Sequence, residues 1–139
     1  MNYLLNTCVI SELVKPKPVA KVVSWLRQQP ENSLFLSSIT IGEIQRGISL
    51  LPESKKRDTL QNWLDRDLRQ RFNQRILNVD FQCARCWGEV QAKAERAGQK
   101  MPAMDSLIAA MALVHGMTVV TRNIRDMEAS GVTLLAPWN

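Results

Sequence analysis

The chain has 139 residues, of which 45% are hydrophobic and 22% are charged, a balance typical of one globular domain and unlike that of a disordered chain. Its longest uninterrupted apolar run, Leu107–Val114, is too short to span a membrane, and its three cysteines do not suggest a disulfide framework. Eighteen Lys and Arg against thirteen Asp and Glu give a formal net charge of +5. Without a basic, apolar leader segment, the sequence predicts a cytoplasmic protein with a single domain over residues 1–139.

Short apolar segments alternate with amphipathic or fully apolar segments along the chain, which is typical of strands and helices that follow one another. In chain order, the predicted elements are a strand at 3–5, a helical turn at 9–14, a helix at 19–29, a strand at 34–36, a loop at 37–38, a helix at 40–51, a basic helix at 54–70, a strand at 76–79, helices at 81–97 and 103–115, and strands at 117–121 and 132–135. This alternation predicts an α/β sandwich around a mostly parallel sheet.

The net positive charge is concentrated in residues 55–75, where seven basic residues and three acids leave an excess of +4. A clustered excess attracts nucleic-acid phosphates, and Arg69, Arg71 and Arg75 are the residues that we expect to contact them. The alternative is a solvated helix with internal ion pairs, because an aspartate stands four residues before Arg69 and another four before Arg71. The sequence leaves both interpretations open.

Two asparagines, Asn6 and Asn123, each come just after a predicted strand. In open parallel sheets the ligand crevice lies outside the carboxyl ends of the strands, so both side chains are candidates for a functional site. Asp126 follows Asn123 by about one helical turn, which could bring the two together. The alternative for each asparagine is a turn residue or a helix N-cap.

Two acids stand out within predicted helices. Glu43 lies beside the apolar stripe of its helix, and Gly47, one turn on, indicates a close approach of some other group, although a solvated glutamate is the alternative. Asp105 begins a helix that is apolar on nearly every face, so its carboxylate needs a partner such as backbone N–H groups or a cation. An N-cap role is the alternative for Asp105.

Oxygen ligands from separate segments suit Mg²⁺ or Mn²⁺, which bind one or two carboxylates together with water and substrate phosphate. A zinc site is a poorer interpretation of Cys83 and Cys86, because it would need all three cysteines and His115, the only histidine. Without a strand–helix–strand context before them, these two cysteines are read as ordinary core or surface residues.

Five segments, in the same order along the chain, resemble PIN-domain toxins of the VapC and FitB type. The first reads Tyr-Leu-Leu-Asn-Thr-Cys-Val-Ile-Ser-Glu-Leu, where the family pattern has Leu-Leu-Asp-Thr followed by Asn or Cys and Val-Ile-Ser-Glu. The others are Ser-Ser-Ile-Thr-Ile-Gly-Glu-Ile, Pro-Ala-Met-Asp-Ser-Leu-Ile-Ala-Ala, Val-Thr-Arg-Asn-Ile-Arg-Asp and Ala-Pro-Trp. These matches lie at residues 3–13, 37–44, 102–110, 120–126 and 136–138.

This resemblance implies a PIN-like α/β/α sandwich and a Mg²⁺- or Mn²⁺-dependent ribonuclease that is the toxin of a toxin–antitoxin pair. Glu43 and Asp105 would hold the metal, with Asn6 at the position of the family's first metal-binding acid. Asn123 and Asp126 would support the acidic pocket. The resemblance also implies an antitoxin that covers the site, a homodimer, and a structured RNA substrate, often tRNA.

The sequence departs from the family pattern at Asn6, where the family has its first aspartate. An amide is nearly isosteric with the acid but neutral, and hard cations prefer the carboxylate, so we expect metal-assisted cleavage to suffer. A deliberate inactivating substitution is the favoured explanation and a naturally silenced homologue is the alternative. Two functions therefore stay open: a ribonuclease toxin whose cleavage activity is impaired by Asn6, and a module that binds RNA or an antitoxin without cleavage.

Overall fold

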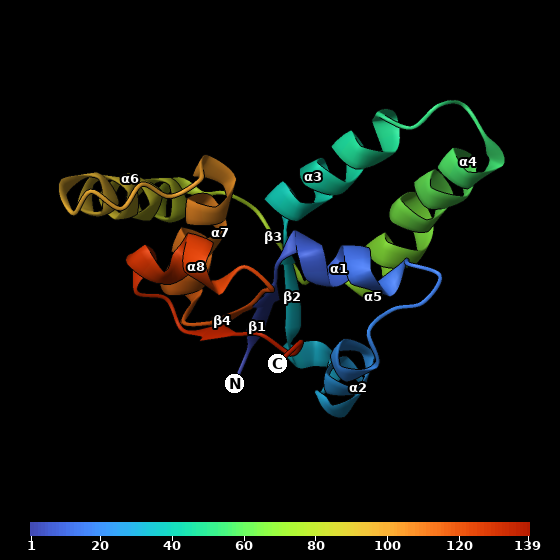
Figure 1. Ribbon diagram of the computed structural model, residues 1–139, viewed down its shortest axis with the longest axis horizontal. Helices are drawn as coiled ribbons and strands as arrows, with labels where there is room; N and C mark the ends of the chain where they lie inside the picture. Colours follow the sequence, from blue (N-terminus) through green and yellow to red (C-terminus); the bar gives the residue numbers. More distant parts are fainter.

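The structure is a computed structural model that describes all 139 residues, and its centre is a sheet of five parallel strands (Figure 1). The strand order is β3-β2-β1-β4-β5, and every neighbouring pair is parallel. The strands are β1 (Tyr3–Leu5), β2 (Leu34–Ser37), β3 (Ile76–Leu77), β4 (Thr118–Val120) and β5 (Leu134–Leu135). The prediction of a mostly parallel sheet is confirmed.

Helices connect the strands and cover both faces of the sheet. They are α1 (Thr7–Leu13), α2 (Ala20–Gln28), α3 (Ser38–Ser49), α4 (Lys55–Asn62), the π-helical η2 (Trp63–Leu68), α5 (Arg69–Arg71), α6 (Phe81–Arg96), α7 (Ala103–His115) and α8 (Ile124–Met127), with 3₁₀ turns η1 (Glu31–Ser33) and η3 (Glu128–Ser130). The segments α4, η2 and α5 follow one another without a break and correspond to the predicted basic helix. None of the helices is both long and apolar enough to cross a membrane.

Successive side chains of the central strands point to opposite faces of the sheet and so divide the core in two. Leu4 and Val119 pack with residues of α6, α7 and α8 in one cluster of buried residues. Leu5 and Val120, one residue later in each strand, pack with residues of α1, α2, α3 and η2 in the other. The sheet is therefore the middle layer of the α/β/α sandwich that the sequence predicted.

The end of β2 differs from the sequence prediction. Ser37 and Ser38 were expected to form a loop, but Ser37 ends the strand and Ser38 begins α3 directly. The Ser37 hydroxyl makes this possible because it accepts a hydrogen bond from the N–H of Ile39 at 3.0 Å, which caps the helix. The predicted strand at 76–79 is also shorter, since only Ile76 and Leu77 pair with β2.

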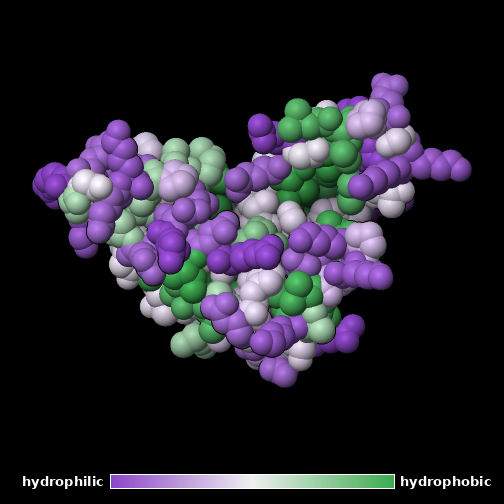
Figure 2. All heavy atoms as spheres, in the orientation of Figure 1, coloured by the Kyte–Doolittle hydropathy of each residue, from purple (hydrophilic) through white to green (hydrophobic).

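Two helical arms diverge from the carboxyl end of the sheet (Figure 1). One consists of α3 and the run α4–η2–α5, and the other of α6 and α7. The space-filling view shows the surface notched between the arms (Figure 2). This notch opens at the strand ends, which is where the candidate residues were expected to meet.

Candidate functional site

Asn6 joins the first strand to the first helix at the centre of the sheet. It follows β1, and its side chain is buried with only 4% of the residue exposed. Its Oδ1 accepts the N–H of Thr7 at 2.9 Å, and its Nδ2 donates to Oγ1 of Thr121 at 3.0 Å. Asn6 therefore caps α1, as the alternative interpretation held, and is also bound to the end of β4.

Thr121 brings the two predicted asparagines to one place. Besides bonding Asn6, its Oγ1 accepts the backbone N–H of Asn123 at 3.1 Å. Asn123 precedes α8, is exposed and does not cap that helix with its side chain. The N–H of Asp126 donates to the Asn123 carbonyl at 3.2 Å, which confirms that the two residues lie one turn apart.

Glu43 is tied to the same corner of the sheet through Thr7. The Thr7 hydroxyl donates to Oε1 of Glu43 at 2.6 Å, so α3 is linked to the first residue of α1. Glu43 is half-buried and also lines a cavity of about 180 Å³ between α1, α3 and α4. Gly47 borders this cavity too, but a Cβ there would meet no atom within 4 Å, so the expected close approach at this glycine is not made within the chain.

Asp105 lies in the first turn of α7 and is half-buried. Burial raises its pKa, and the negative charges of Asp126 and Glu43 raise it further. The helix that carries Asp126, α8, packs against α7, and Glu43 is bonded to Thr7 at the end of β1, so the three acids lie at the same end of the sheet. Asp105 does not cap the helix, because Pro102 holds that position.

The carboxylates Glu43, Asp105 and Asp126 have no basic partner. The chain contains four ion pairs, and all of them use other acids. Three acids gathered without a basic side chain leave negative charge that a bound cation would offset. The site is therefore rich in acidic groups that no basic side chain neutralises.

Ser106 fixes the turn that carries Asp105. Its Oγ accepts hydrogen bonds from Nε1 of Trp87 at 3.0 Å and from Nε2 of Gln91 at 2.7 Å, and donates to the Ala103 carbonyl at 2.8 Å. Both donors belong to α6, so α7 is held against that helix at its first turn. Asp105 is thus placed by a neighbour that is fully buried.

Sequence reasoning missed Thr7, Thr121 and Ser106, which hold the candidate side chains in place. One signal was available for the first two, since each is a hydroxyl residue within two positions of a strand-end asparagine. The hydrogen bonds that give these residues their role join positions 15 to 115 residues apart, which spacing along the chain does not reveal.

The donor set fits Mg²⁺ or Mn²⁺ only in part. Nowhere does the chain bring three Asp, Glu, His or Cys side chains into positions from which they could hold one ion together. Glu43 and Asp105 offer hard oxygen donors, whereas both polar atoms of the Asn6 amide already have protein partners. This set suits an ion held by one or two carboxylates, water and a substrate phosphate rather than an all-protein cage.

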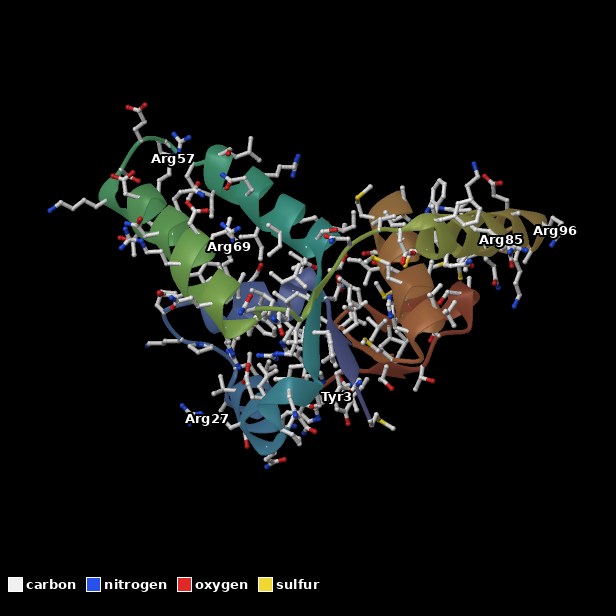
Figure 3. All side chains as sticks on the ribbon, turned by 180° about the vertical axis from the view of Figure 1, so that it is seen from behind. Tyr3, Arg27, Arg57, Arg69, Arg85 and Arg96 are labelled. Carbon is white, nitrogen blue, oxygen red and sulfur yellow. The ribbon has the colours of Figure 1, made fainter.

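The basic residues that were expected to contact phosphates differ in their surroundings. Arg71 and Arg75 both form ion pairs with Glu31, at 3.1 and 3.0 Å, and Arg75 also donates to the Leu34 carbonyl at 2.6 Å. Arg69 is exposed, forms no ion pair, and lies on the same arm as Arg57 (Figure 3).

The i,i+4 ion pairs proposed for this segment do not form. The partners are used elsewhere: Asp65 accepts hydrogen bonds from Nε2 of Gln61, and Arg71 is paired with Glu31.

The two cysteines of α6 behave as packing residues. Cys83 is buried and Cys86 is half-buried. Burial raises the pKa of both thiols, which favours the unreactive protonated form. His115 ends α7 on the surface, before Gly116 in the left-handed conformation.

The comparisons with known proteins agree with this architecture. The family model described as PIN domain matches residues 3–129. The chain is 39% identical over 135 residues to the plasmid stability protein StbB of Pseudomonas syringae pv. tomato, with 97% of each chain covered. It is 35% identical to the VapC ribonuclease Y4jK of Sinorhizobium fredii over 135 residues, which cover 97% of this chain and 96% of that one.

The toxin FitB of Neisseria gonorrhoeae is 35% identical over 136 residues, 98% of each chain. The crystal structure of FitAcB from the same organism matches with a TM-score of 0.94 and 35% identity, and the match covers 99% of each chain. Sequence, fold and order of motifs thus agree over nearly the whole length. The chain belongs to the PIN-domain family, among the toxins of the VapC and FitB type.

Proposed function

We propose that this chain is the toxin of a type II toxin–antitoxin pair, a Mg²⁺- or Mn²⁺-dependent endoribonuclease in which Asn6 weakens or abolishes cleavage. The observation that carries this proposal is the placement of Glu43, Asp105 and Asp126 at the carboxyl end of the sheet without a basic partner. Burial and the charges of the other two acids raise the pKa of Asp105, in agreement with this placement. Carboxylates that repel one another and have no basic partner are expected where a divalent cation binds.

In this proposal Glu43 and Asp105 hold the ion, and Asn6 occupies the position of a third ligand. A bound Mg²⁺ or Mn²⁺ would lower the pKa of a coordinated water and offset the charge that develops on the phosphate. The chain's own residues orient these groups. Thr7 holds one oxygen of Glu43, and Ser106 fixes the turn that carries Asp105.

The outer residues of the site have supporting roles. Asp126 adds negative charge that favours a cation at Asp105. Asn123, exposed and beside Thr121, offers an amide that can hydrogen-bond a water or a substrate oxygen. The Asn123 side chain does not cap α8, and the Asp126 carboxylate forms no ion pair, so both side chains are free to interact with a ligand.

The substrate is proposed to be structured RNA, with tRNA the first to test. Arg69 is the best phosphate contact of the three arginines expected from the sequence, because Arg71 and Arg75 already bind Glu31. The proposal also includes an antitoxin that covers the site and a homodimer of this chain, and the toxin–antitoxin complexes of similar proteins support the antitoxin.

A second function is favoured by one observation at Asn6. Its Nδ2 donates to Thr121 and its Oδ1 accepts from Thr7, so both polar atoms of the amide have protein partners, and the amide carries no charge toward a cation. On this alternative the chain binds RNA or its antitoxin without cleaving RNA.

A cleavage assay decides between the two. Labelled tRNA is incubated with the chain and with Asn6→Asp, in Mn²⁺, in Mg²⁺ and in chelator. The nuclease proposal expects metal-dependent fragments that increase with Asn6→Asp and disappear again when Asp105→Asn is added. If no variant cleaves any structured RNA in either metal, the binding function replaces the nuclease.

A further inference from the structure

One basic residue at the edge of the site has an aromatic neighbour and no acidic partner. Arg122 follows Thr121, the residue that bonds both Asn6 and Asn123. Its own backbone N–H donates to Sγ of Cys8 at 3.3 Å, so its backbone is held between the end of β4 and the first turn of α1. The backbone of Arg122 therefore lies directly beside residues proposed to form the site.

The side chain of Arg122 is exposed and lies over the indole ring of Trp138. Its Cζ is 5.7 Å from the ring centroid, within the range of a cation–π interaction. None of the four ion pairs of the chain includes Arg122. Arg75 makes a useful contrast, because it also lies over an aromatic ring, that of Phe72, but is paired with Glu31.

The Trp138 ring beneath Arg122 is held in place by the hydrophobic core. It is half-buried and packs against the core cluster that contains Leu5 and Val120. Its indole nitrogen is buried without a hydrogen-bond partner. The pKa of nearby Glu12 is lowered mainly by the Val19 N–H and by Lys15, with a smaller contribution from this nitrogen. The ring beneath Arg122 is therefore fixed from below by the core.

We propose that Arg122 binds a backbone phosphate of the RNA substrate next to the acidic site, an inference that rests on the proposed function. A guanidinium held over an aromatic ring without an acidic partner leaves N–H groups free, and these match the geometry of a phosphate. The three carboxylates of the site repel phosphates, so RNA that approaches them needs a nearby fixed positive charge. Arg122 supplies that charge, and its stacked side chain loses less conformational freedom on binding than a mobile one would.

Equilibrium binding of labelled tRNA, in chelator and over a series of salt concentrations, tests the proposal without cleavage. Arg122→Gln should weaken binding about tenfold, since one charge-assisted hydrogen bond is lost. It should also reduce the slope of log affinity against log salt by about 0.7 to 0.9. Arg122→Lys should keep most of the slope. Arg125→Gln, an exposed arginine of α8 without an aromatic partner, is the matched control and should change both quantities less.

An unchanged affinity and slope in Arg122→Gln would overturn the proposal. If that variant also unfolds at a lower temperature, the role of Arg122 is to hold Trp138 rather than to bind RNA. The outcome is separable from that of the cleavage assay. RNA binding that depends on Arg122, without cleavage by Asn6→Asp, refutes the nuclease and keeps the phosphate contact. Cleavage that is indifferent to Arg122 refutes the contact alone, and a chain that binds no RNA refutes both.

Discussion

Replacing Asn6 by aspartate should make the stability of the protein depend on divalent metal. The structure accommodates the change, because one oxygen can keep the Thr7 N–H and the Thr121 hydroxyl can turn to donate to the other. The new charge would nevertheless be buried in the region of Glu43, Asp105 and Asp126, where burial and the charges of the other two acids already raise the pKa of Asp105. Without metal, the variant should therefore be less stable than the parent chain.

The expected magnitude follows from burial and charge. A buried carboxylate that keeps its hydrogen bonds but gains like-charged neighbours should cost about 1–2 kcal/mol, or roughly 3–8 °C in the unfolding midpoint. A metal at a concentration one hundred times its dissociation constant returns about 2.7 kcal/mol. The Asn6→Asp variant should thus unfold below the parent in chelator and at or above it in saturating Mn²⁺.

Thermal unfolding followed by circular dichroism, in chelator and over a titration of Mn²⁺ or Mg²⁺, measures both effects. Asn32→Asp is the matched control: it adds the same charge to an exposed residue of η1, which precedes β2 at the opposite end of the sheet. If the metal-induced rise in midpoint is the same for Asn6→Asp, Asn32→Asp and the parent chain, position 6 does not bind the ion and our reasoning about its charge is wrong. A gain of about 2.7 kcal/mol in the transition state would also appear as a hundredfold faster cleavage.

Three further outcomes are expected. Asp105→Asn in chelator should raise the unfolding midpoint by up to about 4 °C, equivalent to about 1 kcal/mol or less after solvent screening. Because the pKa of Asp105 is raised in the folded protein, this gain in stability should grow as the pH rises above the ordinary value of 3.8 and vanish below it. A gain that grows toward acid pH would contradict the assignment. Thr7→Val should cost about 1 kcal/mol in denaturant unfolding, because the donor to Glu43 is lost, and an unchanged midpoint would mean that this bond does not form in solution. Arg69→Gln should flatten the salt dependence of RNA binding by about 0.7 per lost contact without altering stability, whereas Arg75→Gln should cost about 2 kcal/mol of stability; the reverse pattern would show that Arg75 rather than Arg69 meets the RNA.

Local signals predicted the helices and strands well where they were strong. The helix over 103–115 was predicted with the bounds that α7 has, because Pro102 precedes it and Gly116 follows in the left-handed conformation, with φ of 64°. Signals failed where one residue has two roles, as Ser37 does in ending β2 and capping α3. The strand at 76–79 was too long, because pairing with β2, rather than apolar character, ends β3.

The candidate site was predictable to the extent that parallel strands end at one edge of a sheet. That rule, together with the family resemblance, brought Asn6, Glu43 and Asp105 to attention before their contacts were known. The partners of the basic segment could not be found in this way. Glu31 lies 40 residues before Arg71, and only the folded chain brings them together. The local pattern offered nearer acids, but Asp65 is bonded to Gln61 and Arg71 is paired with Glu31 instead.

The contacts of Glu31 with Arg71 and Arg75 have a consequence for how the length of this protein can vary. These ion pairs and the pairing of β2 with β3 hold both ends of the arm built from α3, α4, η2 and α5 against the sheet. The tip of the arm between α3 and α4, where Leu50 is 69% exposed, takes no part in these contacts. Doubling the length of such a loop costs only about 0.6 kcal/mol of closure entropy. Insertions at the tip would therefore change how far the arm reaches over the notch while the base of the arm, and the acidic residues beside it, stay in place.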